Sequence, residues 1–216
     1  ILVLAATGLA ITFGVMGVIN MAHGEFIMLG AYTAWGVQQM LPGRPGLALL
    51  LAVPAALLVS GGMGVLLERT VIRFLYGRPL ETLLATFGVS LVLQQAVRSV
   101  FSPLNRAVQT PDFMSGVWQI TPHFALTCNR VYIMLFCLGV FACIHAAMHR
   151  TRLGLEVRAV SQNRPIARCM GVRAARVDAL TFGLGSGVAG MAGVALSQRN
   201  KELFEETVKL INDFKE

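Results

Sequence analysis

The sequence predicts an all-α protein, a polytopic bundle of about six transmembrane helices. Of its 216 residues, 55% are hydrophobic and only 13% are charged, whereas soluble domains carry about 25% charged residues. The mean hydropathy is +0.66. The apolar residues gather in long runs, and a bilayer core about 30 Å thick needs roughly 20 of them per helix. These features exclude a disordered chain, a disulfide scaffold and a typical soluble enzyme.

Six runs are long enough to cross a bilayer, some of them with the help of tilt. The second run is short and starts at Glu25, so it is expected to be broken or partly re-entrant. Pro42, Pro45 and Gly46 predict a tight connection to the third run. Pro54 lies inside that run, where neighbouring helices can satisfy the freed backbone groups. The expected segments are approximately 1–19, 25–41, 46–67, 80–97, 131–148 and 179–197.

The arginines between the runs predict the orientation. Segment 68–78 has three arginines and segment 149–178 has seven, so the positive-inside rule places both in the cytoplasm. Two expected helices separate the segments, which agrees with this placement. The stretch 101–130, which contains Trp118, is then an outer, mostly uncharged lid. The net charge is +7, but the basic residues cluster between long apolar runs and not on an amphipathic surface, so no nucleic-acid partner is expected.

The first candidate site is the junction of the first two runs, where Asn20, His23 and Glu25 stand close together. If the junction lies in cytoplasmic water, these are ordinary loop residues. The alternative is a chain break at membrane depth, permitted by Asn20 and Gly24, that lines a polar cavity. Ionisable groups inside a membrane are costly and usually functional, so the three residues are candidates for a translocation path. The lesser candidates are Gln94 and Gln95.

No metal site or cofactor is expected in this chain. His23 and Glu25 form an H-x-E triplet, but the P-C-x-x-C of zinc deaminases is absent. No two cysteines have C-x-x-C spacing. A P-loop needs a lysine that reaches the phosphates, and the first lysine is Lys201. Any ATP hydrolysis must therefore take place in another polypeptide.

The run 179–197 has a pattern of small residues that predicts close helix packing in lipid. Its serine does not fit the G-x-S-x-G of hydrolases, because Leu184 and Val188 stand where glycines are needed. The residues expected to mediate packing are Gly183, Gly187, Gly190 and Gly193.

The loop 149–178 contains a predicted short helix. Asn163 is a good N-cap, Pro165 suits the first turn, and Gly171 can end the helix. So short a helix is not stable alone, and we expect a partner to hold its apolar face. A solvated loop explains the arginines but not this pattern. The face comprises Ile166, Cys169 and Met170, flanked by Arg164 and Arg168, which are expected to pair with acidic groups of the partner.

The last residues, 199–216, differ in composition from the rest, because all three lysines and five of the eleven acidic residues lie there. Apolar residues on one helical face predict an amphipathic helix. We expect this tail to pack weakly, to have no transport role and to stand in place of further membrane helices.

Three stretches resemble the permease of bacterial branched-chain-amino-acid-type ABC importers, and within that family its urea-uptake branch. They are GLAITFGVMGVINMAHGEFIMLGAY (8–32), YGRPLETLLATFGVSLVLQQAVR (76–98) and RAVSQNRPIARCMGVRAARVDALTFGLGSGVAGMAGVALSQ (158–198). The resemblance implies an inner-membrane permease domain over 1–198, incomplete at both ends, that is not an enzyme and forms a path for urea or a related small amide or amino acid.

The same resemblance implies partners: a second permease subunit, two ABC ATPase subunits that use ATP, and a periplasmic substrate-binding protein. It also implies that 159–171 couples the permease to the ATPase. Two other interpretations stay open, a passive urea or amide channel and a fragment without function. A membrane-embedded enzyme would need a nucleophile–base pair, which the sequence does not offer. The residues of the implied coupling segment are Ala159, Gln162, Asn163, Arg164, Ile166, Ala167, Met170 and Gly171.

Overall fold

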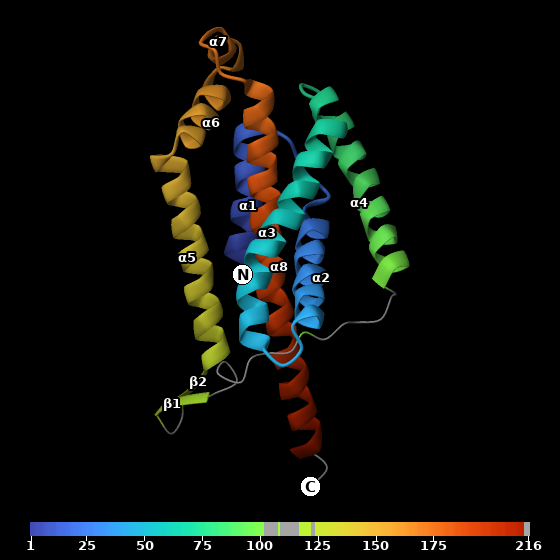
Figure 1. The fold of residues 1–216 in the computed structure, drawn as a ribbon, viewed down its shortest axis with the longest axis vertical. Helices are drawn as coiled ribbons and strands as arrows, with labels where there is room; N and C mark the ends of the chain where they lie inside the picture. Colours follow the sequence, from blue (N-terminus) through green and yellow to red (C-terminus); the bar gives the residue numbers. More distant parts are fainter. Residues whose placement is uncertain (102–107, 109–116, 122–123, 214–216) are drawn as a thin grey trace.

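The computed structural model describes residues 1–101, 108, 117–121 and 124–213 (Figure 1). Each of the six expected membrane segments is helical there, so the predicted helical bundle is confirmed. The helices are α1 (Leu2–Met16), α2 (His23–Met40), α3 (Pro45–Thr70), the 3-10 helix η1 (Ile72–Phe74), α4 (Pro79–Phe101), α5 (Cys128–Arg150), α6 (Arg152–Gln162), α7 (Arg164–Cys169) and α8 (Ala174–Asp213).

Four helical stretches of the described chain are long and apolar enough to cross a membrane. They are Pro45–Phe74, Pro79–Phe101, Asn129–Arg150 and Ala174–Gln198. Helix α1 is apolar but has only 15 residues, and α2 has 18. The bundle is therefore polytopic, with two short helices at its N-terminal end.

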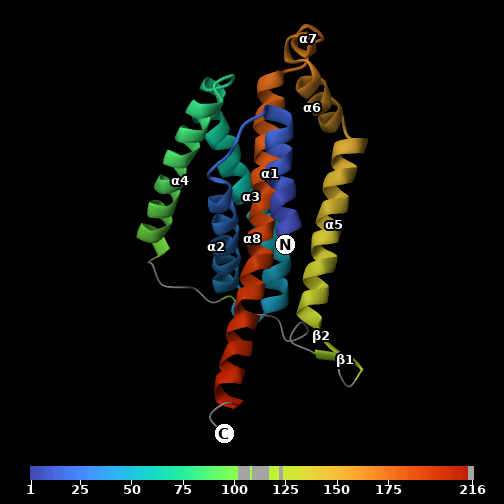
Figure 2. The same cartoon turned by 180° about the vertical axis from the view of Figure 1, so that it is seen from behind.

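Helix α8 forms the centre of the bundle, with α1, α2 and α3 packed around it (Figures 1 and 2). In its apolar window 83% of the residues are buried, against none in the window of α5. Helices α4 and α5 flank this core on opposite sides (Figure 1). The core is thus built from helices that are far apart in the sequence.

The four glycines of the α8 pattern lie at its contacts with α2 and α3. A Cβ on Gly183 would lie 3.2 Å from the carbonyl oxygen of Gly61, and one on Gly187 would lie 3.0 Å from that of Leu57. On the other side, a Cβ on Gly30 of α2 would overlap the backbone of Gly190. A Cβ on Gly193 would likewise overlap the backbone of Ile27. Backbones can approach this closely only where no side chain intervenes.

Three parts of the fold differ from the expected elements. Helix α6 was not predicted, although Thr151 caps it by accepting a hydrogen bond from the Gly154 N–H at 3.4 Å. Strands β1 (Val117–Thr121) and β2 (Phe124–Thr127) pair as an antiparallel hairpin in the expected outer lid. The rest of that lid, 102–107, 109–116 and 122–123, lies outside the described residues. Finally, α8 runs without a break to Asp213, so the tail continues a core helix.

The two arginine-rich connections lie at the same end of the molecule. Figure 1 shows α7 and the turn between α3 and α4 at one end, and the β1–β2 hairpin at the opposite end. This arrangement is the one that the predicted orientation requires.

Candidate functional site

The junction between α1 and α2 is a break in the half of the bundle that lies towards α6 and α7. Helix α1 ends at Gly17, whose φ of 63° is left-handed and whose N–H donates to the Phe13 carbonyl oxygen at 2.8 Å. The connection then runs beside α3 and α8, from the level of α6 towards the start of α2 (Figures 1 and 2). Gly24 was expected to permit the irregular turn, but it lies inside α2. Gly17 permits the turn instead, because glycine adopts a left-handed conformation without a Cβ penalty.

Buried apolar side chains hold this break in place. Val18, Ala22 and Phe26 are buried in one cluster with Phe182 of α8. The rings of Phe26 and Phe182 meet edge to face, with centroids 6.3 Å apart. The start of α2 is therefore packed directly against α8.

Asn20 and His23 face the interior of the bundle. The Asn20 Oδ1 accepts a hydrogen bond from the Ala22 N–H at 3.0 Å. The His23 Nε2 lies 2.9 Å from the Ala5 carbonyl oxygen of α1, which fixes the proton on Nε2 since a carbonyl only accepts. Among the described residues, neither the Asn20 Nδ2 nor the His23 Nδ1 has a hydrogen-bond partner. His23 thus joins the start of α2 to α1, whereas Asn20 bonds within the break, and neither side chain lines the cavity described next.

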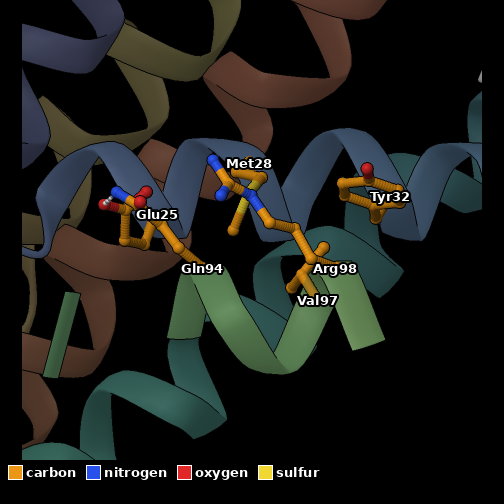
Figure 3. A pocket seen from close by; sticks show the side chains of 6 residues that line it. All are labelled: Glu25, Met28, Tyr32, Gln94, Val97 and Arg98. Carbon is orange, nitrogen blue, oxygen red and sulfur yellow. Dashed lines mark hydrogen bonds between the residues drawn. The ribbon is translucent and has the colours of Figure 1, made fainter. Parts of the chain in front are cut away.

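A cavity of about 470 Å³ lies between α2 and α4. Figure 3 shows Glu25 and Gln94 together at one end of it, with the Arg98 side chain extending along the same space. The Gln94 Nε2 donates to the Glu25 Oε1 at 2.7 Å, and the Ser90 hydroxyl donates to the same oxygen. The lining residues are Glu25, Met28, Tyr32, Gln94, Val97 and Arg98.

Helix α4 meets the rest of the bundle through a polar face. The buried side chains Thr82, Thr86 and Ser90 repeat every four residues, so they lie on one side of the helix. The Thr86 Oγ1 accepts a hydrogen bond from the Met21 N–H in the break at 3.2 Å. Helix α4 is therefore attached to the break and to α2 by hydrogen bonds, at the wall of the cavity.

Of the two candidate glutamines, only Gln94 reaches the cavity. Gln95 is one residue further, about 100° around the helix, and its side chain is exposed. Ser90, Tyr32 and Arg98 also belong to this site and were not predicted from the sequence. Ser90 was detectable, since it precedes Gln94 by four residues and such pairs share a helix face.

The short helix in the loop 149–178 forms as predicted. The Asn163 Oδ1 accepts a hydrogen bond from the Ile166 N–H at 3.1 Å, and Gly171 has a left-handed φ of 86°. Ile166 is 60% exposed and Met170 is 79% exposed. Ala167 is buried in a cluster that joins α6, α7 and the start of α8. Of the other predicted coupling residues, Gln162 is exposed and Ala159 is partly buried.

Arg164 does not point to a partner, contrary to expectation. Its guanidinium forms an ion pair with the carboxylate of Asp178 in α8, because α7 folds back over the start of that helix. Arg168 is exposed. Only one of the two arginines is thus available to an external acidic group.

Comparisons with known proteins agree with this architecture. Residues 1–210 match the family described as branched-chain amino acid transport system / permease component. The chain is 28% identical over 204 residues to the high-affinity branched-chain amino acid transport system permease protein LivH of Salmonella typhimurium, covering 90% of this chain and 66% of the relative. It is 29% identical over 210 residues to the permease protein BraD of Pseudomonas aeruginosa, covering 91% and 66%.

A probable LivH of Methanocaldococcus jannaschii is 23% identical over 206 residues, covering 89% of this chain and 61% of the relative. No solved structure matches. The chain thus spans slightly less than two thirds of the length of these curated relatives. The relatives are transport permeases and not enzymes, and the chain is a multi-pass protein of the inner membrane. It belongs to the permease-component family of branched-chain amino acid transport systems.

Proposed function

We propose that this chain forms part of the membrane permease of an ATP-driven importer, and that the cavity between α2 and α4 receives urea or a related small amide. The observation that carries the proposal is the Glu25 carboxylate at one end of a cavity within the helical bundle. A carboxylate in the membrane-spanning part of a protein is costly and usually functional. The resemblance to the urea-uptake branch suggests urea as the substrate, so the groups that line the cavity should match the hydrogen-bonding groups of urea.

The chemistry of the cavity suits a planar amide. Urea has amino groups that donate and one carbonyl that accepts. Among the residues that the structure describes, the side-chain donors to Glu25 both meet Oε1, so Oε2 can accept an N–H of the substrate. The guanidinium of Arg98 can donate to the carbonyl. An unpaired buried polar group costs about 1–3 kcal/mol, so these groups would replace water contacts that urea loses.

A branched-chain amino acid is the second candidate substrate. The names of the relatives support it, since LivH and BraD are permease proteins of branched-chain amino acid transport systems. The opposite charges of Glu25 and Arg98 would also suit a zwitterion, and Met28 and Val97 offer apolar surface.

Uptake of labelled urea and labelled leucine by the whole permease, assembled with its ATPase subunits, tests this proposal. We expect urea to be imported and Glu25→Gln to lower its uptake roughly tenfold or more, because a charged hydrogen bond contributes about 1.5–3 kcal/mol. The matched control is Glu81→Gln, which removes an exposed carboxylate of α4 outside the cavity.

Three outcomes would contradict the proposal. Import of leucine and not urea would make the amino acid the substrate. Urea flux that persists without the ATPases would indicate a passive channel. If Glu25→Gln leaves urea uptake unchanged, the cavity is not part of the translocation path.

We further propose that the segment Ala159–Gly171 docks into an ATPase subunit and couples ATP hydrolysis to transport. Support comes from the position of α7 at one end of the molecule (Figure 1) and from its exposed apolar pair, Ile166 and Met170. A cleft that buried them would gain roughly 1.5–3 kcal/mol per side chain. The second permease subunit, the two ATPase subunits and the periplasmic binding protein belong to the same proposal.

Substitution of Met170 tests the docking. Met170→Asp should release the ATPase subunits and abolish uptake, because burying an unpaired charge is strongly unfavourable. Met170→Leu keeps the apolar contact and should behave like the wild type. Co-purification of the ATPase subunits and uptake are the two measurements. If the Met170→Asp permease still co-purifies with the ATPase subunits and shows normal uptake, the segment does not couple the two proteins.

A further inference from the structure

Arg164 connects three parts of the chain that are far apart in the sequence. It is the first residue of α7, directly after the Asn163 cap. Its guanidinium pairs with Asp178 of α8, whose side chain is only 1% exposed. The same guanidinium lies over the ring of Tyr76, with Cζ 4.3 Å from the ring centre. Tyr76 stands in the connection between η1 and α4.

The contacts continue from Tyr76 into α3. The Tyr76 hydroxyl donates a hydrogen bond to the Glu68 Oε1 at 3.1 Å, and Glu68 is 2% exposed. Burial and the nearby carboxylates of Asp178 and Glu68 raise the pKa of the Tyr76 hydroxyl, so it stays a donor at neutral pH. An unbroken series of polar contacts thus joins α7 to α8, to the connection before α4 and to the end of α3.

Helix α7 has little else to fix its position. It has six residues, which is far below the length at which a helix is stable alone. Ala167 is its buried residue, while Ile166, Arg168 and Cys169 are exposed. The orientation of the exposed face therefore depends on the Asn163 cap, on Ala167 and on the two contacts of Arg164.

We infer that Arg164 is the positioning residue that holds α7 against the membrane helices, through Asp178 on one side and Tyr76 on the other. The inference rests on the proposed function at one point, which is that an ATPase subunit docks on α7. A displacement of α7 on docking would then act directly on the start of α8 and on the connection that leads into α4. Helix α4 carries Ser90 and Gln94, which bind Glu25 in the cavity.

A spin label on α7 tests the positioning without any transport. Cys169 is exposed and lies at the end of α7, so it accepts a nitroxide once the other cysteines, Cys128, Cys137 and Cys143, are replaced by alanine. In the wild-type background we expect a restricted spectrum. Arg164→Met should add a mobile component, because it removes both contacts.

The controls separate positioning from charge and from misfolding. Arg168→Met removes an exposed arginine of the same helix and should leave the spectrum unchanged. Arg164→Met leaves the Asp178 carboxylate buried without its cation, which alone could destabilise the protein. The double variant Arg164→Met/Asp178→Asn avoids this, because the asparagine side chain carries no charge. The double variant should also show the mobile component. A restricted spectrum in the double variant would overturn the inference.

Transport is measured separately in the assembled importer. Arg164→Met/Asp178→Asn should keep the ATPase subunits bound and hydrolysing ATP while losing most of the uptake per ATP, because docking no longer reaches α8 and α4. Normal uptake per ATP together with a mobile label would overturn the inferred transmission through Arg164. Failure of the proposed function itself is distinguishable, because the wild type would then show no ATP-dependent uptake while its label stayed restricted.

Discussion

At the residue scale, three buried or half-buried carboxylates of the described chain are stabilised by specific partners. Glu68 has the Tyr76 hydroxyl, Asp178 has Arg164, and Glu25 has Ser90 and Gln94. Removing one partner of a buried charge is more costly than never having formed the pair, since the remaining charge stays desolvated. Single substitutions at these positions should therefore have effects out of proportion to the number of atoms removed.

Tyr76→Phe is the smallest such change, because it removes one oxygen atom. We expect it to lower the free energy of unfolding by about 1–3 kcal/mol at neutral pH, the cost of leaving an acceptor of Glu68 unsatisfied. Unfolding in detergent measures this. Tyr32→Phe is the control, because it removes the same atom and keeps the ring contact with Phe101, and its loss should be smaller. Equal losses in both variants would contradict the assigned hydrogen bond.

The same hydroxyl predicts a pH dependence. Its pKa is raised by burial in the folded protein, whereas an unfolded tyrosine ionises near pH 10. The stabilisation that it provides is therefore complete below about pH 10 and falls as the pH rises further, because the unfolded chain loses its proton first. The stability difference between wild type and Tyr76→Phe should narrow above pH 10. A difference that is constant up to pH 11 would contradict this.

At the scale of the elements, two kinds of helix contact divide the molecule. Helices α2, α3 and α8 meet backbone to backbone at glycines, while α4 meets α2 through hydroxyl and amide groups. Lipid gives no hydrophobic drive for helix association, so close packing and hydrogen bonds are what remain. The glycine contacts of α2, α3 and α8 cannot rearrange without a steric clash, whereas the hydrogen bonds between α4 and α2 can exchange partners.

Gly30→Ala tests the close contact. Its Cβ would overlap the backbone of Gly190, which cannot move aside as a flexible side chain can. Overpacking typically costs about 1–3 kcal/mol, and we expect the upper end of that range or loss of folded protein. Gly36→Ala in the same helix is the matched control, because nothing lies within 4 Å of its Cβ. Size-exclusion profiles and unfolding in detergent give the comparison, and equal stability of the two variants would refute the predicted contact.

What the sequence could predict follows from the range of the interactions. The cap at Asn163 and the end at Gly171 depend on a few neighbouring residues, and both were predictable. The division of Asn20, His23 and Glu25 between the core and the cavity was not, because it depends on which helices lie opposite. The pairing of Arg164 with Asp178 was missed for the same reason, since an exposed arginine and a buried one look alike in a sequence.

At the scale of the whole molecule, the cavity lies at the boundary between a rigid core and a flanking helix. One wall belongs to α2, which is locked to α8 by Gly30, and the other belongs to α4. Helix α4 begins beside the connection that carries Tyr76, at the end of the molecule where α7 lies (Figure 1). In the inferred transmission, a displacement of α7 would act on the α4 wall of the cavity, which is held by hydrogen bonds, and not on the α2 wall, which is packed against α8.

This direction of transmission requires α7 to face the cytoplasm. Segments 68–78 and 149–178 carry three and seven arginines, and both lie at one end of the molecule with the β1–β2 hairpin at the other (Figure 1). The positive-inside rule places the arginine-rich end in the cytoplasm. In intact cells, a membrane-impermeant maleimide should leave Cys169 unlabelled until the membrane is permeabilised. A cysteine introduced by Trp118→Cys into a variant without the other cysteines should be labelled from outside. Labelling of Cys169 in intact cells would invert the topology and remove α7 from the reach of any cytoplasmic ATPase.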